Sequence, residues 1–184
     1  RLRETTLNEA LSCGPQDHVK AVKKIQKEAR TLGYEKRKLE TKYQEVLTGF
    51  LLSTGCLQSK ENQSSGNAPR LILHHKEGAD MGFLQGLASA LQKKQPEVWV
   101  WLSATPLPKE KNEKPSKDGY FVLAGPADKN SAVKDLGAKI AEVLNGRGGG
   151  PLGRFGGKAQ GLRKKTVREQ VEALIAETLP LRPK

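Results

Sequence analysis

The residues best suited to chemistry lie in one segment, Gly146 to Gly161, where eight of sixteen residues are glycine and every charge is positive. Glycine lacks a Cβ, so its amides are accessible and positive φ angles are allowed, which lets a loop fold closely around phosphate oxygens. The segment therefore predicts a Gly-rich loop that contacts a polyanion. A flexible linker is the alternative, but the segment lacks serine, and Leu152 and Phe155 offer apolar anchors to a core.

The predicted contacts combine loop amides, which would fit around a phosphate backbone, with cations that would neutralise its charge. Between Gly146 and Lys165 there are six lysines or arginines and no acidic residue. The candidate contact residues are Gly146, Arg147, Gly148, Gly149, Gly150, Gly153, Arg154, Gly156, Gly157, Lys158, Arg163, Lys164 and Lys165.

Other catalytic chemistry has little support in the sequence. His74 and His75 are adjacent on a predicted strand, so their side chains point to opposite faces and do not share one metal ion. Cys13 and His18 are five residues apart, without the second pair of ligands that a zinc site needs. The glycines are not followed by the Gly-Lys-Ser/Thr of a Walker A loop, and no Gly-x-Ser-x-Gly occurs. We predict no catalytic residue and no metal site in this chain.

Composition agrees with a polyanion as partner. The chain has 184 residues with 32 Lys and Arg against 20 Asp and Glu, which gives a net charge of +12. Such a balance favours nucleic acid or anionic surfaces. No apolar run reaches the roughly 20 residues that span a bilayer, and none resembles a signal peptide, so we expect a cytoplasmic protein without a membrane partner. Position 1 is Arg, and we expect the chain to be part of a longer protein.

The first 57 residues predict a long helix. Apolar or small residues recur at spacings of three and four for about four heptads, which indicates a coiled-coil-like seam. Either the helix pairs with another subunit or it lies on the domain that follows, and the pattern does not separate the two. The seam consists of Val22, Ile25, Ala29, Leu32, Leu39, Tyr43, Val46 and Phe50, with Lys36 where one more apolar residue would fall; a homodimer would form through Val22, Ile25, Leu32, Leu39, Tyr43 and Val46.

Residues 58–69 are polar and small and predict a linker. From residue 70 to 184 we expect an α/β domain in which short β-rich runs and amphipathic segments follow in the order strand, helix, strand, strand, helix, with one more helix at the end. Trp99 and Trp101 share one face of the second strand, where packing under a helix is favoured over stacking on bases. The expected strands are 70–75, 97–103 and 120–124, and the expected helices are 81–94, 132–144 and 166–179.

Several segments of the sequence resemble a known family. The stretch from Ala141 to Gly150 (AEVLNGRGGG), followed by Gly153 to Ala159 (GRFGGKA), and the strand Tyr120 to Pro126 (YFVLAGP) resemble the DHH-associated C-terminal domain (C-Ala-like) of alanyl-tRNA synthetases and long-form, free-standing alanyl-tRNA editing proteins (AlaX). The segment Leu11 to Gln26 (LSCGPQDHVKAVKKIQ) is similar to the junction between catalytic domain and helix in the editing proteins.

The resemblance implies a tRNA-binding module, with tRNA(Ala) as the expected partner, in a protein that deacylates Ser-tRNA(Ala) or Gly-tRNA(Ala). The family's zinc ligands, a His-x-x-x-His pair and a Cys-x-x-x-His pair, are absent from this sequence. The resemblance therefore places the zinc cofactor and the hydrolysis outside this chain, for which we predict no cofactor. The alternatives are a dimerisation or interdomain module without RNA binding, and a phosphoesterase accessory domain, which the lack of histidine in the glycine segment disfavours.

Overall fold

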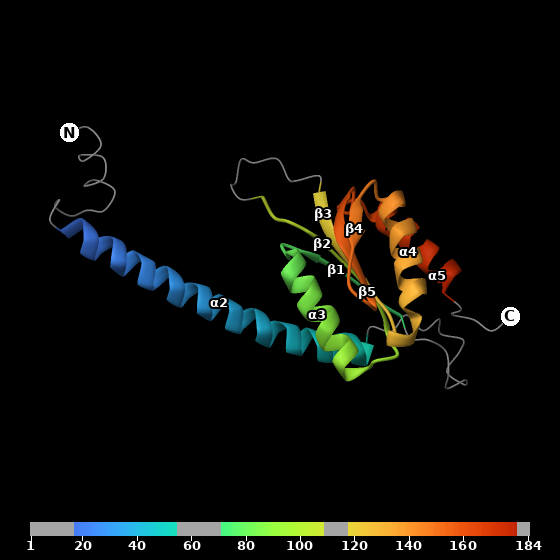
Figure 1. The fold of residues 1–184 in the computed structure, drawn as a ribbon, viewed down its shortest axis with the longest axis horizontal. Coiled ribbons are helices and arrows are strands. Elements are labelled where there is room, and N and C mark those ends of the chain that lie inside the picture. Colours follow the sequence, from blue (N-terminus) through green and yellow to red (C-terminus); the bar gives the residue numbers. More distant parts are fainter. Residues whose placement is uncertain (1–16, 55–70, 109–117, 180–184) are drawn as a thin grey trace. The chain divides into compact units, whose positions relative to one another are not determined.

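We describe residues 17–54, 71–108 and 118–179 in a computed structural model (Figure 1). The helices are α2 (His18–Thr54), α3 (Met81–Lys94), α4 (Asn130–Val143) and α5 (Lys165–Thr178), and a short 3-10 helix, η2 (Ala127–Lys129), precedes α4. The strands are β1 (Leu71–Glu77), β2 (Trp99–Thr105), β3 (Asp118–Ala124), β4 (Arg147–Gly149) and β5 (Arg154–Gln160). The chain divides into two compact units, residues 1–43 and residues 44–184.

The second unit is built on a five-stranded sheet in the order β1-β2-β3-β5-β4. β1 and β2 are parallel, whereas the other pairs are antiparallel. The helix α3 covers one face of the sheet, and α4 and α5 cover the other (Figure 1). The predicted α/β class is confirmed, and the three predicted strands and three predicted helices are present in the predicted order, each within two residues of its expected bounds. The strands β4 and β5 are additional to the prediction.

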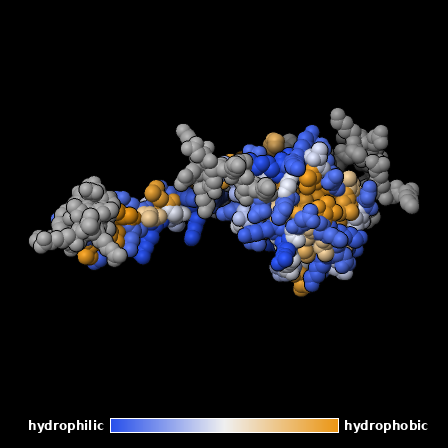
Figure 2. All heavy atoms as spheres, turned by 90° about the horizontal axis from the view of Figure 1, so that it is seen from above, coloured by the Kyte–Doolittle hydropathy of each residue, from blue (hydrophilic) through white to orange (hydrophobic). Residues whose placement is uncertain are grey.

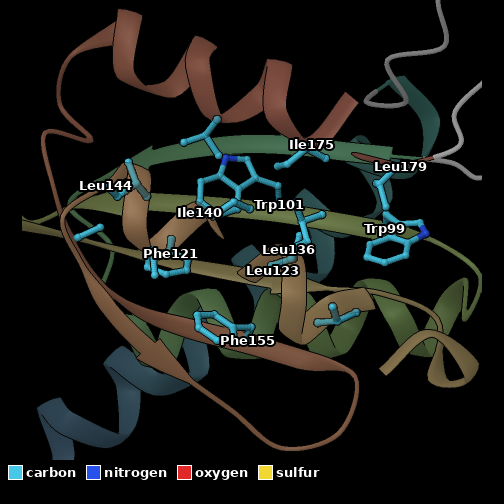
Figure 3. Close-up of a cluster of buried hydrophobic side chains, with 14 of the residues drawn as sticks. Trp99, Trp101, Phe121, Leu123, Leu136, Ile140, Leu144, Phe155, Ile175 and Leu179 are labelled. Carbon is cyan, nitrogen blue, oxygen red and sulfur yellow. The ribbon is translucent and has the colours of Figure 1, made fainter. Parts of the chain in front are cut away.

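The core on the α4 and α5 face contains the tryptophans and phenylalanines of the sheet (Figure 3). Trp101 is buried, and its ring lies 5.5 Å from that of Phe121, which in turn stacks on Phe155 at 6.1 Å. Trp99 is also buried in this cluster. The two tryptophans therefore pack under helices, as predicted, and are not available to stack on bases.

The core on the α3 face is aliphatic. Leu84, Leu87 and Leu91 of α3 pack on the opposite side of the same strands, together with the carboxyl-terminal end of α2. The amide of Gln44 donates a hydrogen bond to the carbonyl of Phe83 at 3.0 Å, which ties that end of α2 to the start of α3. The last turns of the long helix thus belong to the α/β unit.

The first unit contains the amino-terminal part of α2, which confirms the predicted long helix. Its apolar seam is open to solvent, since Ile25 is 51% exposed and Leu32 and Leu39 are each 66% exposed. Hydrophobic and hydrophilic atoms lie next to each other along the helix (Figure 2). No helix in the described part of the chain is long and apolar enough to cross a membrane. The predicted linker, 58–69, lies outside the described residues.

The prediction of a loop over the glycine-rich segment was wrong for most of its length. Arg147–Gly149 and Arg154–Gln160 are antiparallel strands, and only residues 150–153 connect them. Glycine is depleted in strands because it loses much conformational entropy and offers no side chain to pack. Here β5 is held between two neighbouring strands, so pairing with β3 and β4 outweighs that low propensity.

Candidate nucleic-acid interface

At several positions of the β4–β5 hairpin, close packing explains the presence of glycine without a ligand. A Cβ on Gly148 would lie 2.6 Å from a ring carbon of Phe155, and a Cβ on Gly157 would lie 2.6 Å from the Cα of Gly148 and closer still to the carbonyl oxygen of Arg147. The amide of Gly146 already donates to the carbonyl of Ala141 at 2.8 Å. Close strand pairing and packing on Phe155 thus account for much of the glycine in this segment.

Gly149 differs from these glycines. It is exposed, and a Cβ built on it would have no heavy atom within 4 Å. Gly153 has a φ of +78° in the connection between the two strands, a conformation that glycine adopts without strain. Gly153 is nevertheless buried, and its carbonyl accepts a hydrogen bond from the amide of Gly125 at 3.2 Å, so Gly149 at the hairpin edge offers the open backbone that a ligand could reach.

Arg147 and Lys158 are brought together by the hairpin. They are directly opposite each other in the β4–β5 register, and Lys158 is opposite Tyr120 of β3. Residues opposite each other on antiparallel strands point to the same face, and Tyr120 packs with the α3 core. Arg147 and Lys158 are both exposed. They lie on the same face of the sheet as α3, but α3 packs on β2 and β3, whereas the two cations lie on β4 and β5. The two cations therefore form an open basic pair at the edge of the sheet.

Arg154 is held by α3 and is not grouped with that pair. Its Nε donates to Oε1 of Gln92 at 3.1 Å and its Nη1 donates to Oγ of Ser89 at 2.7 Å. Gln92 in turn donates to the carbonyl of Gly125 at 2.8 Å. Lys158 is four residues away, about 13 Å along an extended strand. Arg154 thus joins β5 to α3 by hydrogen bonds to neutral acceptors, and no acidic side chain among these partners balances its charge.

The cations Arg163, Lys164 and Lys165 lie at the start of α5. Nη2 of Arg163 donates to the carbonyl of Pro106 at 3.0 Å, and Lys165 is 3.4 Å from the carboxylate of Glu169. Lys164 is exposed and immediately precedes the helix without a side-chain cap. The predicted contact residues are therefore distributed over three places: the hairpin edge, the β5–α3 junction and the start of α5.

The two predicted apolar anchors behave differently. Phe155 is buried in the α4 and α5 core, as predicted, whereas Leu152 is 75% exposed in the connection between β4 and β5. The prediction that Leu152 anchors the segment was wrong. Its position in the connection keeps it away from the sheet, whereas Phe155 lies within β5 and faces α4.

One polar contact that sequence reasoning did not identify joins the two parallel strands. Nδ1 of His75 lies 2.9 Å from Oγ of Ser103, which is opposite it in the register. Burial lowers the pKa of His75, and the nearby Arg168 lowers it further. Burial also lowers the pKa of His74, with a smaller effect from Lys76. Within the described residues, no group of three His, Cys, Asp or Glu side chains is placed to hold a metal ion; Cys13 and Cys56 lie outside them.

No model of a known protein family matches the chain. Among curated proteins, the alanyl-tRNA editing protein Aarsd1 of Rattus norvegicus is 33% identical over 174 residues, which cover 95% of this chain and 36% of that protein. Aarsd1-A of Xenopus laevis is 30% identical over 177 residues, which cover 96% of this chain and 36% of that protein. The chain thus spans about a third of the length of the curated relatives it matches.

Among solved structures, the C-Ala domain from Aquifex aeolicus alanyl-tRNA synthetase matches with a TM-score of 0.50 and 19% identity, over 63% of this chain and 96% of that domain. That identity supports the fold alone. The resemblance inferred from the sequence is confirmed: the chain is a homologue of part of the alanyl-tRNA editing proteins and has a C-Ala-like fold.

Proposed function

We propose that this chain is the tRNA-binding module of an alanyl-tRNA editing protein and that it contacts RNA phosphates through the β4–β5 hairpin. The observation that carries the proposal is the open basic pair, Arg147 and Lys158, beside the exposed backbone of Gly149. Homology to proteins named for alanyl-tRNA editing makes tRNA the expected polyanion. In this proposal the parent protein is an aminoacyl-tRNA hydrolase, and its catalytic zinc lies outside this chain.

The geometry favours backbone contact over base reading. Cations on a sheet edge reach phosphates without entering a groove, and structured RNA is recognised mainly by shape and backbone. Arg154, Arg163, Lys164 and Lys165 would add charge from neighbouring elements, with Arg154 pre-positioned by Ser89 and Gln92. Because each neutralised phosphate releases counterions, affinity should fall steeply as salt rises.

The experiment is tRNA binding by the Arg147→Gln/Lys158→Gln variant, measured by fluorescence anisotropy with a tRNA(Ala) transcript at several salt concentrations. We expect weaker binding. We also expect the slope of the logarithm of the binding constant against the logarithm of the salt concentration to be smaller in magnitude by about two, one for each lost phosphate contact. The matched control is Lys134→Gln/Lys139→Gln, which removes the same charge from the exposed side of α4. If both variants bind alike, the hairpin is not the site.

A second candidate function is self-association, which the exposed apolar seam of α2 favours. Ile25, Leu32 and Leu39 would leave a large apolar stripe in water unless another helix covers it. In this case the helix pairs two copies and the basic hairpin only interacts with solvent. The two functions are separable, since one resides on α2 and the other on the sheet edge.

A further inference from the structure

The amino-terminal part of α2 segregates its charges by face. Eight of the nine Lys and Arg residues between positions 18 and 43 fall within an arc of about 140° at 100° per residue. The ninth, Lys36, lies in the apolar seam on the opposite side. No acidic residue of this stretch falls within the arc. We call these eight residues the cationic stripe: Lys20, Lys23, Lys24, Lys27, Arg30, Arg37, Lys38 and Lys42.

The acidic residues occupy the border of the apolar seam. Glu28 and Glu35 lie on one side of the seam and Glu40 on the other. Because acids are kept out of the stripe, its charge is little compensated within the described residues: of the eight cations, Lys20 alone has an ion pair, with Asp17 at 3.2 Å. All eight side chains are exposed. Such a sorted arrangement differs from the mixed charges of an ordinary solvated helix.

We propose that the cationic stripe is a second RNA-binding surface, which lies along the phosphates of a double-helical stem. Lys20 to Lys42 spans about 33 Å at 1.5 Å per residue, which gives one cation per about 4 Å. Each strand of double-stranded DNA presents one phosphate per about 3.4 Å of duplex axis, and the spacing along an RNA duplex is of the same order. The linear charge densities are therefore similar. The inference deepens the proposed function, because the hairpin and the stripe would hold the same class of ligand.

An aromatic side chain within the stripe also fits RNA better than an acidic protein surface. Tyr34 lies in the middle of the arc between Arg30 and Lys38 and is 69% exposed. An exposed aromatic ring among cations can stack on an unpaired base next to a stem, such as a base in the loop that closes it.

An anionic membrane is the less suitable occupant. A helix that lies in a membrane surface buries its apolar face and places cations near the headgroups. In α2, Glu28, Glu35 and Glu40 border the apolar seam, so insertion would bring carboxylates to anionic headgroups. Lys36 would also lie within the buried face.

The test is binding of a 20-base-pair RNA duplex by the 184-residue chain carrying Lys24→Gln, Lys27→Gln and Lys38→Gln. Glutamine and lysine have similar helix propensities, so the helix should persist, which circular dichroism checks. We expect about a tenfold loss of affinity and a salt slope smaller by about two to three. The control, Lys94→Gln/Lys134→Gln/Lys139→Gln, removes the same charge from α3 and α4 and should bind as the unaltered chain does.

The outcomes separate the stripe from the hairpin. If the stripe variant binds the duplex as well as the control while Arg147→Gln/Lys158→Gln loses affinity, the stripe inference is overturned and the hairpin proposal stands. If the stripe variant alone loses affinity for the duplex, the stripe inference stands, and the hairpin proposal is decided by tRNA(Ala) binding as described above. If the unaltered chain binds phosphatidylserine vesicles, the stripe variant does not, and both bind the duplex equally, the stripe inference is overturned in favour of a membrane.

Discussion

At the scale of single residues, Phe155 connects the glycine-rich hairpin to the core. Its ring stacks on Phe121, and Gly137 of α4 leaves room for it, since a Cβ there would lie 2.6 Å from the Cβ of Phe155. We expect Phe155→Ala to lower the free energy of unfolding by about 3–5 kcal/mol, through lost burial and the cavity left behind. Chemical denaturation measures this loss.

Leu152 provides the control for that prediction, because it lies in the same hairpin with 75% of its surface exposed. Leu152→Ala should change the free energy of unfolding by no more than about 0.5 kcal/mol. Similar effects of the two substitutions would show that Phe155 does not connect the hairpin to the core.

A second prediction at this scale concerns pH. Burial lowers the folded-state pKa of His74 and His75 below the ordinary value of 6.5, which the unfolded chain retains. At a pH between the folded and the unfolded pKa values, the unfolded chain binds more protons than the folded chain. The two histidines therefore contribute their full stabilisation above pH 6.5, and this contribution declines as the pH falls below 6.5. Lys76 and Arg168 act in the same direction as burial, and Glu77 acts against it.

The measurement is urea denaturation from pH 7.5 to pH 5. We expect His74→Gln/His75→Gln to flatten the decline, because it removes two groups that bind fewer protons in the folded chain than in the unfolded chain. The slope with pH is compared, because the substitutions also change packing and the hydrogen bond to Ser103. An unchanged slope in the variant would exclude the histidines as its source.

At the scale of elements, periodic segments could be predicted well from the sequence, and the hairpin could not. The predicted helix 81–94 coincides with α3, because Leu84, Leu87 and Leu91 mark one helical face. The strands β4 and β5 lack that signal. Gly148, Gly156 and Gly157 carry no side chains to alternate, so their strand conformation depends on partners that are distant in sequence, such as β3.

The hairpin glycines give an element-scale prediction. Gly157→Ala should detach β4 from β5, because its Cβ would collide with the backbone of Arg147 and Gly148. We expect a loss of about 1–3 kcal/mol in the free energy of unfolding and faster hydrogen exchange of the β4 and β5 amides. Gly149→Ala is the comparison, since nothing lies within 4 Å of that Cβ, and it should leave β4 paired. Equal exchange rates in the two variants would contradict the structural explanation of Gly157.

At the scale of the whole molecule, the positions of the predicted contact residues could not be predicted from their spacing. Arg147 and Lys158 are eleven residues apart and directly opposite each other, whereas Arg154 lies between them in sequence and is bound to α3. Strand register determines the first arrangement, and hydrogen bonds to Ser89 and Gln92 determine the second. Neither follows from the composition of the segment alone.

The seam of α2 gives the prediction about assembly. If two copies pair through it, Ile25 and Leu39 are covered, and Lys36 at one core position favours a defined register at some cost in stability. Ile25→Lys/Leu39→Lys should then shift the sedimentation of the chain from dimer to monomer. The control, Thr31→Lys/Thr41→Lys, adds the same charge within the arc of the cationic stripe and should remain dimeric. Because the stripe faces away from the seam, the control should bind the RNA duplex at least as tightly as the unaltered chain. If the unaltered chain and every variant are monomers, pairing through the seam is wrong. The binding of the RNA duplex then remains as the test of the cationic stripe.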